Sequence, residues 1–442
     1  MRYHLVTLGC PKNTSDSERL ERALRRVGHI AAPSADEADA IIVNSCGFID
    51  AAKDESESVA ALLAGRKRPD QELLVVGCWA QIEPAQVRAR VAGVDALFGI
   101  EAWDEIVEHL GPGGPSDIPQ DRPAVGGRTS AYLKISDGCA RPCTFCNIPA
   151  IKGREFRSAP IDDLVLEAQR LAGEGVKELV LVAQDSTAYG DDLGLRNGDG
   201  LATLLERLAV EVPSVPWLRV MYAYPGFVSP RLVETMASIP QVCHYLDIPL
   251  QHASPELLRR MKRPHNMIMV HDTLDRLRAA MPDIAIRTTF IVGFPGETKA
   301  DFETLLDFLR EVRFDRAGAF SYSPQAGTPA ATMDDQVPEK MRHRRLKRLM
   351  SVQTKISAEI NAAMIGREFP LLVESVEGQR TADGAPLFVG RSYRDAPEVD
   401  GLVFCRGVAR PGTMPLVRIT GAMEHDLLAE PAGAEVISLT LR

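Results

Sequence analysis

Residues 135 to 153 read ISDGCARPCTFCNIPAIKG, and three of the chain's eight cysteines fall within eight positions of this stretch. Cys139, Cys143 and Cys146 follow the apolar run AYLKIS, which predicts a strand, so a glycine-led loop can gather three thiolates around one centre. A structural zinc site needs four closed ligands, and the neighbourhood contains no histidine and no fourth cysteine. A cubane iron–sulfur cluster can instead take three thiolates and leave one iron open. The stretch therefore favours a 4Fe-4S cluster over zinc or a set of core cysteines.

The sequence after this stretch repeats a strand followed by a helix. Runs typical of strands are AYLKIS, ELVLVAQ, WLRVMYAY, YLDIPLQ, IAIRTTFIVG and AGAFSYS, and helical patterns such as IDDLVLEAQRLAGEG and ADFETLLDFLREV separate them. Six βα repeats predict a partial (βα)6 barrel over residues 131–365, with a site among the loops that follow the strands. The segment from Glu339 to about Ile365 contains no glycine or proline and predicts a long helix at the end of this domain.

The first 110 residues also alternate strands and helices. The runs YHLVTLGC, AIIVNSC and ELLVVGC each precede a polar segment long enough for a helix, which is typical of βαβ units and predicts a Rossmann-like parallel sheet over residues 1–110. Each run ends in a cysteine, namely Cys10, Cys46 or Cys78. The carboxyl ends of parallel strands meet at one edge, where open α/β sheets place their sites, so these thiols are expected to come together. The simpler alternative is three small buried apolar residues.

The remaining segments complete the domain layout. Residues 111–127 hold nine Gly or Pro, which neither helices nor strands tolerate, so residues 111–130 are predicted to form a linker. The tail over residues 366–442 shows short runs broken by Gly, Pro and Asp and predicts a small all-β barrel. This tail holds eight Arg, no Lys and eleven Asp or Glu, which gives it a formal charge of −3. The fold class is therefore α/β with an all-β C-terminal domain.

The composition excludes several classes of protein. A chain of 442 residues with 45% hydrophobic residues can bury several cores, so disorder is not expected. No run of eighteen apolar residues and no export signal occurs, which predicts a cytoplasmic protein with reduced thiols and no membrane partner. Cys243 and Cys405 have no partners at ligand spacing and are expected in the core. The net charge of −9 leaves nucleic acid possible only through a local basic patch.

The spacing Cys-x3-Cys-x2-Cys after the first strand of a βα series, with Phe145 before the last cysteine, resembles the radical S-adenosylmethionine superfamily. This resemblance implies that the open iron binds the amino and carboxylate groups of S-adenosylmethionine. A reducing electron would then cleave the cosubstrate to methionine and a 5′-deoxyadenosyl radical. Phe145, Gly293 and Gly296 are expected near the cosubstrate, the two glycines through the turn VGFPGET, which could equally be an ordinary turn.

Few other side chains point to chemistry. In the string DIPLQH, His252 follows a predicted barrel strand, so it is either a site residue or a satisfied loop histidine, and the same two interpretations hold for Asp247 and Gln251. No catalytic triad, paired carboxylates or phosphate loop is evident. No catalytic side chain is therefore predicted beyond the cluster ligands.

The order of the domains resembles the methylthiotransferases over essentially the whole chain. This resemblance implies that Cys10, Cys46 and Cys78 hold a second 4Fe-4S cluster with an open iron. It also implies that one S-adenosylmethionine methylates a sulfur there before a second one generates the radical. The strings LGCPKNTSDSERL, ISDGCARPCTFCNIPAIKG and MYAYP resemble the branch that places a methylthio group on the β-carbon of an aspartate in small-subunit ribosomal protein twelve. An electron donor and a sulfur source are the other expected partners.

Two alternative functions stay open. The tRNA-modifying branch usually reads GCQMN at the first string and lacks YAYP. A tRNA adenosine methylthiotransferase would also be expected to carry basic residues on its C-terminal TRAM domain, which this tail resembles, to bind phosphates. The acidic tail suits a basic protein partner better. A non-catalytic iron–sulfur electron carrier or redox sensor is the more distant alternative, and it leaves the six βα units unexplained.

Overall fold

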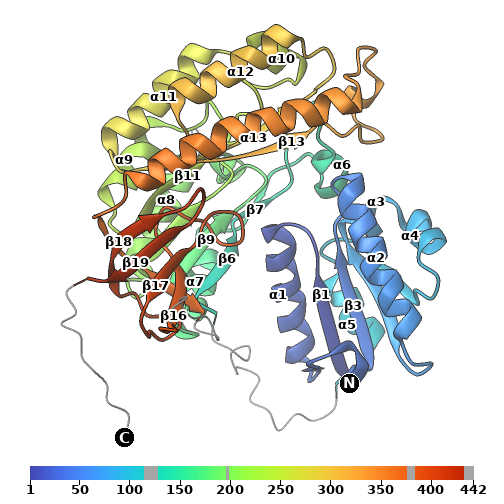
Figure 1. The fold of residues 1–442 in the computed structure, drawn as a ribbon. Coiled ribbons are helices and arrows are strands. Elements are labelled where there is room, and N and C mark those ends of the chain that lie inside the picture. Colours follow the sequence, from blue (N-terminus) through green and yellow to red (C-terminus); the bar gives the residue numbers. More distant parts are fainter. Residues whose placement is uncertain (114–127, 196–198, 376–383, 433–442) are drawn as a thin grey trace, which may run out of the picture.

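The computed structural model describes residues 1–113, 128–195, 199–375 and 384–432 (Figure 1). Most of the predicted linker and the end of the tail lie outside the described residues. The three larger sheets are built from residues 2–98, 130–321 and 368–431. The fold class predicted from the sequence is confirmed, because two α/β sheets precede an all-β region. Within the described ranges, no helix combines the length and the apolar character needed to span a membrane.

The first sheet is parallel, as its sequence pattern predicts. Ile42 packs with Leu20 and Ile106 on one face of this sheet, while Val43 packs with Leu73 on the other. Burial on both faces explains why each strand reads as a continuous apolar run. The strand order is β2 (Ile30–Ala31), β1 (Arg2–Thr7), β3 (Ala40–Ser45), β4 (Glu72–Gly77) and β5 (Ala96–Phe98). The helices are α1 (Pro11–Arg26) and α5 (Trp103–Leu110) on one face, and α2 (Asp50–Arg66), α3 (Cys78–Ile82) and α4 (Pro84–Arg90) on the other.

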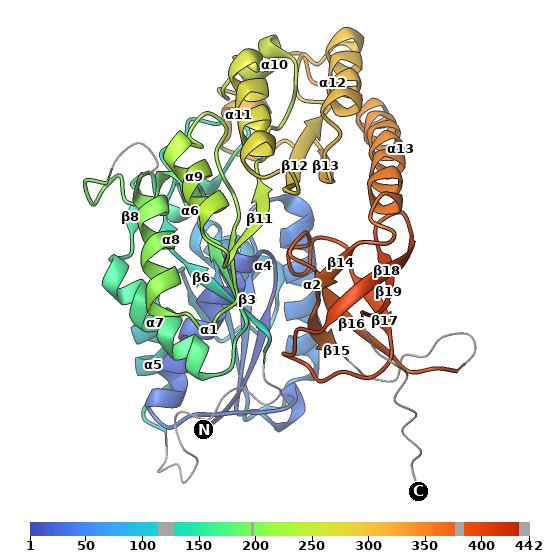
Figure 2. The same cartoon turned by 90° about the vertical axis from the view of Figure 1, so that its left-hand side faces the viewer.

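The second sheet has six parallel strands, which confirms the six predicted βα repeats. Their order is β13 (Arg316–Ser321), β12 (Ala285–Val292), β11 (Val242–Asp247), β10 (Trp217–Val220), β9 (Glu178–Val182) and β6 (Ser130–Lys134). Helices cover its outer face, and the predicted long helix lies beside β13 (Figure 2). These are α7 (Ile161–Gly173), α8 (Asp199–Glu211), α9 (Pro230–Ser238), α11 (Met267–Ala280), α12 (Lys299–Val312) and the long helix α13 (Glu339–Ala362). Short elements in the loops are β7 (Ser136–Asp137), α6 (Ile148–Lys152), β8 (Arg157–Ser158) and α10 (Pro255–Arg260).

The third sheet curls, and it confirms the predicted all-β tail. Its order is β14 (Glu368–Pro370), β18 (Leu416–Ala422), β19 (Leu427–Pro431), β17 (Val403–Arg406), β16 (Leu387–Arg391) and β15 (Leu372–Ser375). All neighbours are antiparallel except β17 and β19. The strands β14 and β15 follow one another in the chain but stand at opposite ends of this order, so the sheet bends back on itself. Hydrogen bonds between Val373 and residues Gly412 and Thr413 join the two ends.

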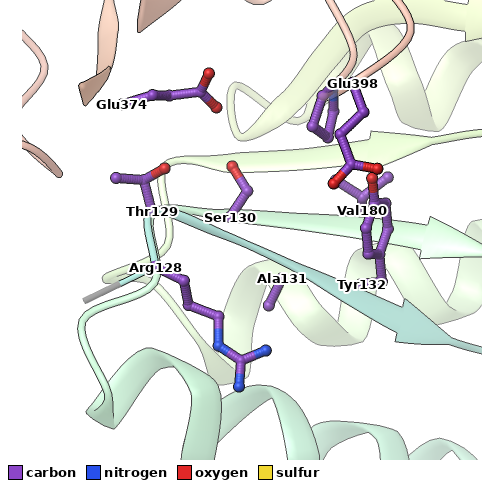
Figure 3. Close-up of a pocket in the computed structure, with 9 residues that line it drawn as sticks. Arg128, Thr129, Ser130, Ala131, Tyr132, Val180, Glu374 and Glu398 are labelled. Atoms are coloured by element: carbon purple, nitrogen blue, oxygen red, sulfur yellow. The ribbon is translucent and has the colours of Figure 1, made fainter. Parts of the chain in front are cut away.

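The C-terminal sheet docks against the inner face of the second sheet, beside the start of β6. A cavity of about 440 Å³ lies at this junction, lined by residues that include Arg128, Tyr132, Glu374 and Glu398. Figure 3 shows the Glu398 carboxylate beside the Tyr132 ring. No cysteine lines this cavity, which lies near the amino-terminal ends of the strands.

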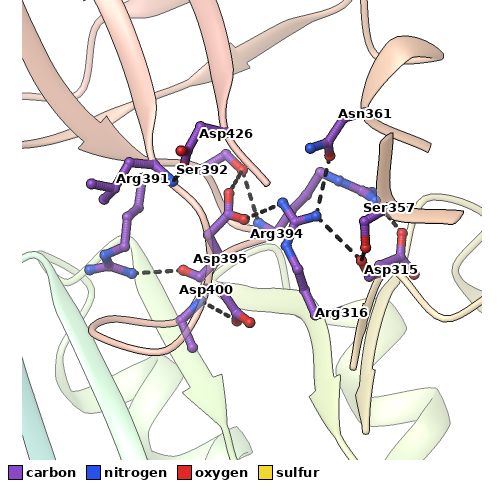
Figure 4. A network of polar contacts seen from close by, with 12 residues as sticks. Asp315, Arg316, Ser357, Asn361, Arg391, Ser392, Arg394, Asp395, Asp400 and Asp426 are labelled. Carbon is purple, nitrogen blue, oxygen red and sulfur yellow. Dashed lines mark hydrogen bonds and ion pairs between the residues drawn. The ribbon is translucent and has the colours of Figure 1, made fainter. Parts of the chain in front are cut away.

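The loop between β16 and β17 fills the inner side of the second sheet with paired charges (Figure 4). Arg391 pairs with the fully buried Glu178 of β9, whose other carboxylate oxygen accepts from Arg219 at 2.6 Å. Further along the loop, Arg394 pairs with Asp315, and Asp395 with Arg316 at 2.7 Å. Burial raises the pKa of Glu178, but the guanidinium groups of Arg391 and Arg219 outweigh it and hold that pKa at about 2. The loop is therefore an ionic plug that ties the C-terminal domain to the barrel.

Replacing Arg391 with Leu should weaken this docking, because Glu178 and Glu374 lose a buried partner. We expect the Arg391→Leu variant to lose about 3 kcal/mol of unfolding free energy. The matched control is Arg418→Leu, since Arg418 pairs with Glu368 at the surface of the same domain, and its cost should stay below about 1 kcal/mol. Urea unfolding of the C-terminal domain, followed by circular dichroism, measures both. Equal losses of unfolding free energy in the two variants would contradict the claim that the ionic plug ties the C-terminal domain to the barrel.

Candidate active site

The three cysteines of residues 135–153 lie in the loop after β6 and β7, at the carboxyl end of the second sheet. The Cys139 amide donates to the carbonyl of Gly153 at 3.1 Å, and the Cys146 amide to the carbonyl of Cys143 at 3.3 Å. These bonds fold the loop back on itself and bring the three thiols within electrostatic reach of one another. Burial raises the pKa of Cys139, and that of Cys146 to about 12. The free thiols of Cys139 and Cys146 are thus protonated at neutral pH, and a bound metal would displace their protons.

Cationic and aromatic side chains surround this loop. Arg263 Nη1 lies 3.8 Å from Cys143 Sγ, in position to donate a hydrogen bond to the sulfur. The guanidinium carbon of Arg263 lies 4.0 Å from the centroid of the Tyr224 ring, and that of Arg141 lies 4.4 Å from the same centroid. Arg141 is held by Asp185 at 2.6 Å. This side of the site therefore carries fixed positive charge next to a thiol.

The other three cysteines lie at the carboxyl edge of the first sheet, one after each of β1, β3 and β4. Cys10 immediately precedes α1, Cys46 directly follows β3, and Cys78 is the first residue of α3. Gly9 approaches Cys46 so closely that a Cβ atom at Gly9 would lie 3.0 Å from Cys46 Sγ. Cys78 Sγ lies 3.6 Å from Asn13 Oδ1. Burial raises the pKa of Cys46, and that of Cys78 to about 12.

A buried group of four charges joins the two cysteine loops. Lys134, in β6, pairs with Asp16 of α1 and with Asp137 at 2.9 Å. Lys152, at the end of α6, pairs with Asp16 at 2.9 Å. All four side chains are buried, and although burial raises the pKa of Asp137, Lys134 and Lys152 lower it well below its usual range. We call these four residues the ionic joint. Beside it, α3, which begins at Cys78, packs on α6, which begins two residues after Cys146 (Figure 1).

Neither cysteine triplet has the geometry of a single-ion site. In the described part of the chain, no three His, Cys, Asp or Glu side chains converge closely enough to chelate one metal ion. A four-iron cluster is larger than an ion and spaces its thiolate ligands more widely. Each loop offers three thiols and no fourth ligand of the same kind. The donor sets therefore fit clusters with one open iron better than zinc.

Three family models together match most of the described chain. The Radical SAM superfamily model matches residues 133–309, the TRAM domain model matches residues 365–431, and the Uncharacterized protein family UPF0004 model matches residues 2–99. Each match falls on one of the three sheets. The first of them shows that the cysteine loop of residues 135–153 belongs to a radical S-adenosylmethionine domain, a family whose members use iron–sulfur clusters.

Named relatives match the chain from end to end. The chain is 50% identical to the ribosomal protein uS12 methylthiotransferase RimO of Chloroflexus aurantiacus, over 97% of this chain and 99% of that protein. It is 48% identical to the protein of the same name from Roseiflexus castenholzii, over 98% and 96%. The chain belongs to the uS12 methylthiotransferase family. The resemblance to the methylthiotransferases, drawn from the order of the domains and from the local strings, is thereby confirmed.

Solved structures of more distant proteins share the fold. The radical S-adenosylmethionine methyltransferase TsrM of Kitasatospora setae, with tryptophan and an S-adenosylmethionine analogue bound, superposes with a TM-score of 0.56 at 12% identity. That match covers 82% of this chain and 90% of TsrM. The cobalamin-dependent radical enzyme OxsB superposes with a TM-score of 0.50 at 12% identity, over 80% and 56%. These likenesses concern the fold of this uS12 methylthiotransferase family member, not its substrate.

Between the cysteine triplets, the string MYAYP forms the loop after β10. The predicted strand WLRVMYAY ends early, at Val220, because Tyr222 takes a left-handed conformation with φ of 64°. Such a backbone costs about 1–3 kcal/mol in a residue other than glycine and persists only where its surroundings fix it. Here Ser186 donates to the Met221 carbonyl, and the Tyr222 amide donates to Asp247 at 3.3 Å. Lys12, two residues after Cys10, places its Nζ 3.6 Å from the centroid of the Tyr222 ring.

The residues predicted in DIPLQH take different places. Asp247 faces the inner side of the second sheet, where it binds Arg287 at 2.9 Å. Gln251 has a left-handed φ of 73° and pairs through its backbone with β12. His252 is fully buried, its Nδ1 accepts from the Ser254 amide at 3.0 Å, and burial lowers its pKa to about 3. Of the three, only Asp247 lies beside Lys12 and Tyr222.

The residues expected near the cosubstrate lie at the ends of β6 and β12. Phe145 packs edge-on against Phe294, with ring centroids 6.5 Å apart. Gly293 and Gly296 have φ of 74° and 81°, and the space that a Cβ would need is filled by Arg342 at Gly293 and by Arg260 at Gly296. The structure thus gives both glycines a reason in close packing, and their contact with an adenosyl group stays a prediction. Cys243 and Cys405 are buried in two apolar clusters, as predicted for core cysteines.

The ionic joint and Lys12 are the features that sequence reasoning missed. The one sequence signal for the ionic joint is Lys134 in AYLKIS, a charged side chain inside a predicted buried strand. The partners of that lysine are far away in the sequence, so the signal does not say what it binds.

Neutralising Asp16 should loosen the first domain from the barrel, because Lys152 would keep only Asp137 at 3.6 Å, and Lys134 would keep Asp137 and the more exposed Glu101 at 3.8 Å. We expect Asp16→Asn to cost about 3 kcal/mol of unfolding free energy and to speed release of the N-terminal domain in limited proteolysis. Asp70→Asn is the control, since Asp70 is an exposed partner of Arg68 in the same domain. Unchanged proteolysis of Asp16→Asn would show that the joint does not hold the domains together.

Proposed function

We propose that this chain attaches a methylthio group to the β-carbon of an aspartate in ribosomal protein uS12. The observation that carries the proposal is the pairing of two cysteine triplets across the ionic joint. Membership of a family whose named members are uS12 methylthiotransferases supports the choice of substrate. Work on a ribosomal protein would place the enzyme in the cytoplasm.

The proposal assigns one 4Fe-4S cluster to each triplet. Cys139, Cys143 and Cys146 would hold the cluster that opens S-adenosylmethionine, and Cys10, Cys46 and Cys78 the auxiliary cluster that holds the sulfur. These clusters supply an electron and open iron positions, chemistry that no side chain offers. One S-adenosylmethionine gives its methyl to the sulfur and leaves as S-adenosylhomocysteine. A second would accept one electron from an external donor and leave as methionine and 5′-deoxyadenosine, the latter carrying the hydrogen taken from the aspartate. The β-carbon radical would then form the C–S bond with the methylthio group held at Cys10, Cys46 and Cys78, and the one electron released would return to the auxiliary cluster.

Side chains of the chain itself prepare this chemistry. Arg263 would keep positive charge beside the cluster bound at Cys143, which favours the more reduced state. Phe145, Gly293 and Gly296 are proposed to border the adenosyl group of the cosubstrate. The domain boundaries that follow are residues 1–110 for the auxiliary cluster, 131–365 for the radical domain and 366–442 for the TRAM-like domain.

The charges of the C-terminal domain favour a protein substrate over tRNA. Arg391 and Arg394 are buried in ion pairs with the barrel, and Arg418 pairs with Glu368. Arg391 and Arg394 are therefore committed inside the chain and are not available to phosphates, whereas Arg418 stays at the surface. A basic protein such as a ribosomal protein suits the remaining acidic surface better.

Two clusters predict a definite iron content. Anaerobic reconstitution of the wild type should bind about eight irons per chain, four for each cluster. Changing all of Cys10, Cys46 and Cys78 to Ala should halve this number, and so should changing Cys139, Cys143 and Cys146. The control Cys243→Ala removes a buried cysteine outside both triplets and should keep the full content. If either triple variant retained all of its iron, the assignment of that triplet would be wrong.

The reaction itself is tested by incubating the reconstituted protein anaerobically with reductant, S-adenosylmethionine, and either small ribosomal subunits or bulk tRNA. Mass spectrometry should find one methylthio group on a uS12 aspartate peptide and unchanged tRNA. Modified tRNA adenosine with unchanged uS12 would contradict the substrate.

Single variants separate the two triplets in the same assay. Cys143→Ala should abolish formation of 5′-deoxyadenosine, whereas Cys46→Ala should keep it and lose sulfur transfer. Equal formation in both variants would refute this division of labour.

A further inference from the structure

Lys12, the second residue of α1, extends toward the inner side of the second sheet. Its ammonium lies over the ring of Tyr222, which packs with the inner-face residues Met221 and Tyr245. The side chain is half-buried, and the Tyr222 ring supplies one face of its surroundings. An ammonium group has three N–H donors, and an aromatic ring satisfies them only in part.

Lys12 lacks the carboxylate partner that other buried lysines have. Lys53 binds Glu83, Lys134 binds Asp16 and Asp137, and Lys152 binds Asp16. Among the described residues, by contrast, no carboxylate forms an ion pair with Lys12 and no acceptor takes a hydrogen bond from it. A cation withdrawn from water without a partner is costly, and such a cost is typical of a group that binds a ligand.

The nearest acidic groups are already committed elsewhere. Asp247, which acts electrostatically on Lys12, accepts from Arg287 and from the Tyr222 amide. Asp137, the other such carboxylate, is held by the two lysines of the ionic joint. The Lys12 ammonium therefore stays free to meet an anion that enters from outside.

Lys12 lies between the cysteine triplet proposed to hold the sulfur and the triplet proposed to generate the radical. On one side it is two residues from Cys10. On the other it touches Tyr222, whose neighbour Tyr224 stacks on Arg263, the residue next to Cys143 Sγ. A carbon that must meet both a radical source and a sulfur source has to come to this region.

We propose that Lys12 binds the carboxylate of the substrate aspartate and so positions its β-carbon between the two cysteine triplets. The inference rests on the proposed function. The carboxylate carbon is bonded directly to the β-carbon, so one ion pair at Lys12 fixes the reacting atom within a bond length. The same contact selects aspartate over asparagine, which has the same β-carbon and hydrogen but no charge.

The test compares uS12 carrying aspartate at the modified position with uS12 carrying asparagine there, in anaerobic turnover followed by mass spectrometry. A hydrogen-bonded ion pair is worth about tenfold to a hundredfold in kcat/KM, so the wild type should prefer aspartate by that factor. Lys12→Met should lose activity on aspartate by the same factor and treat the two substrates alike. Lys12→Arg should keep the preference. Lys355→Met, which removes an exposed lysine of α13, should match the wild type.

The possible outcomes distinguish a failure of the proposed function from a failure of the proposed role of Lys12. No methylthio product from the wild type with aspartate would overturn the proposed function. Wild-type activity with the same aspartate preference in Lys12→Met would overturn the role of Lys12 alone. Iron and sulfide content are measured for each variant. If Lys12→Met and Lys12→Arg both lost the iron of the auxiliary cluster, Lys12 would be a structural part of that loop and the proposal would be wrong.

Discussion

The architecture depends on one buried carboxylate, Asp16. It accepts from Lys134 on the first strand of the barrel and from Lys152 on the helix that follows the radical-domain cysteines. Without it, the two lysines would share Asp137, and Lys134 would have only the more exposed Glu101 as a further partner, at a cost of several kcal/mol. Satisfying these charges requires that the first domain sit on the barrel in one orientation. That orientation brings α3 against α6, and with them the two cysteine loops.

The C-terminal domain applies the same principle at the opposite end of the barrel. Its plug carries Arg391, Arg394 and Asp395 into the inner side of the sheet, where Glu178, Asp315 and Arg316 receive them. Buried ion pairs of this kind contribute more to a unique docking geometry than to net stability. They also use up cations that an RNA-binding domain of the same fold would present to phosphates. Docking and substrate choice are thus linked through the same arginines.

Much of the fold could be predicted from local patterns. Apolar runs predict the parallel strands, and the cysteines at their ends predict that Cys10, Cys46 and Cys78 lie at one edge of the sheet, because parallel strands share a direction. The spacing of Cys139, Cys143 and Cys146 indicates the radical S-adenosylmethionine superfamily from sequence alone, because one short loop holds all three cysteines. Both inferences needed only residues that are close in sequence or strands with a common polarity.

What could not be predicted depends on contacts between distant segments. Lys134 and Asp16 are 118 residues apart, and Lys152 and Asp16 are 136 apart. The plug loop reads as an ordinary connection between strands, because its role exists only after docking. The sequence predicts Tyr222 in a strand, because its left-handed backbone is fixed by contacts with Ser186 and with Asp247 at the end of β11, which are distant in sequence. Lys12 was hidden for the same reason, because its partner ring comes from the barrel.

The central claim is that the ionic joint holds two cluster-binding loops next to each other. Electron paramagnetic resonance of the fully reconstituted and chemically reduced protein tests it most directly. We expect two reduced 4Fe-4S clusters that couple magnetically and give a broadened, rapidly relaxing signal. The Asp16→Asn change should weaken this coupling. A spectrum that is the simple sum of two independent clusters, unaffected by that change, would contradict it.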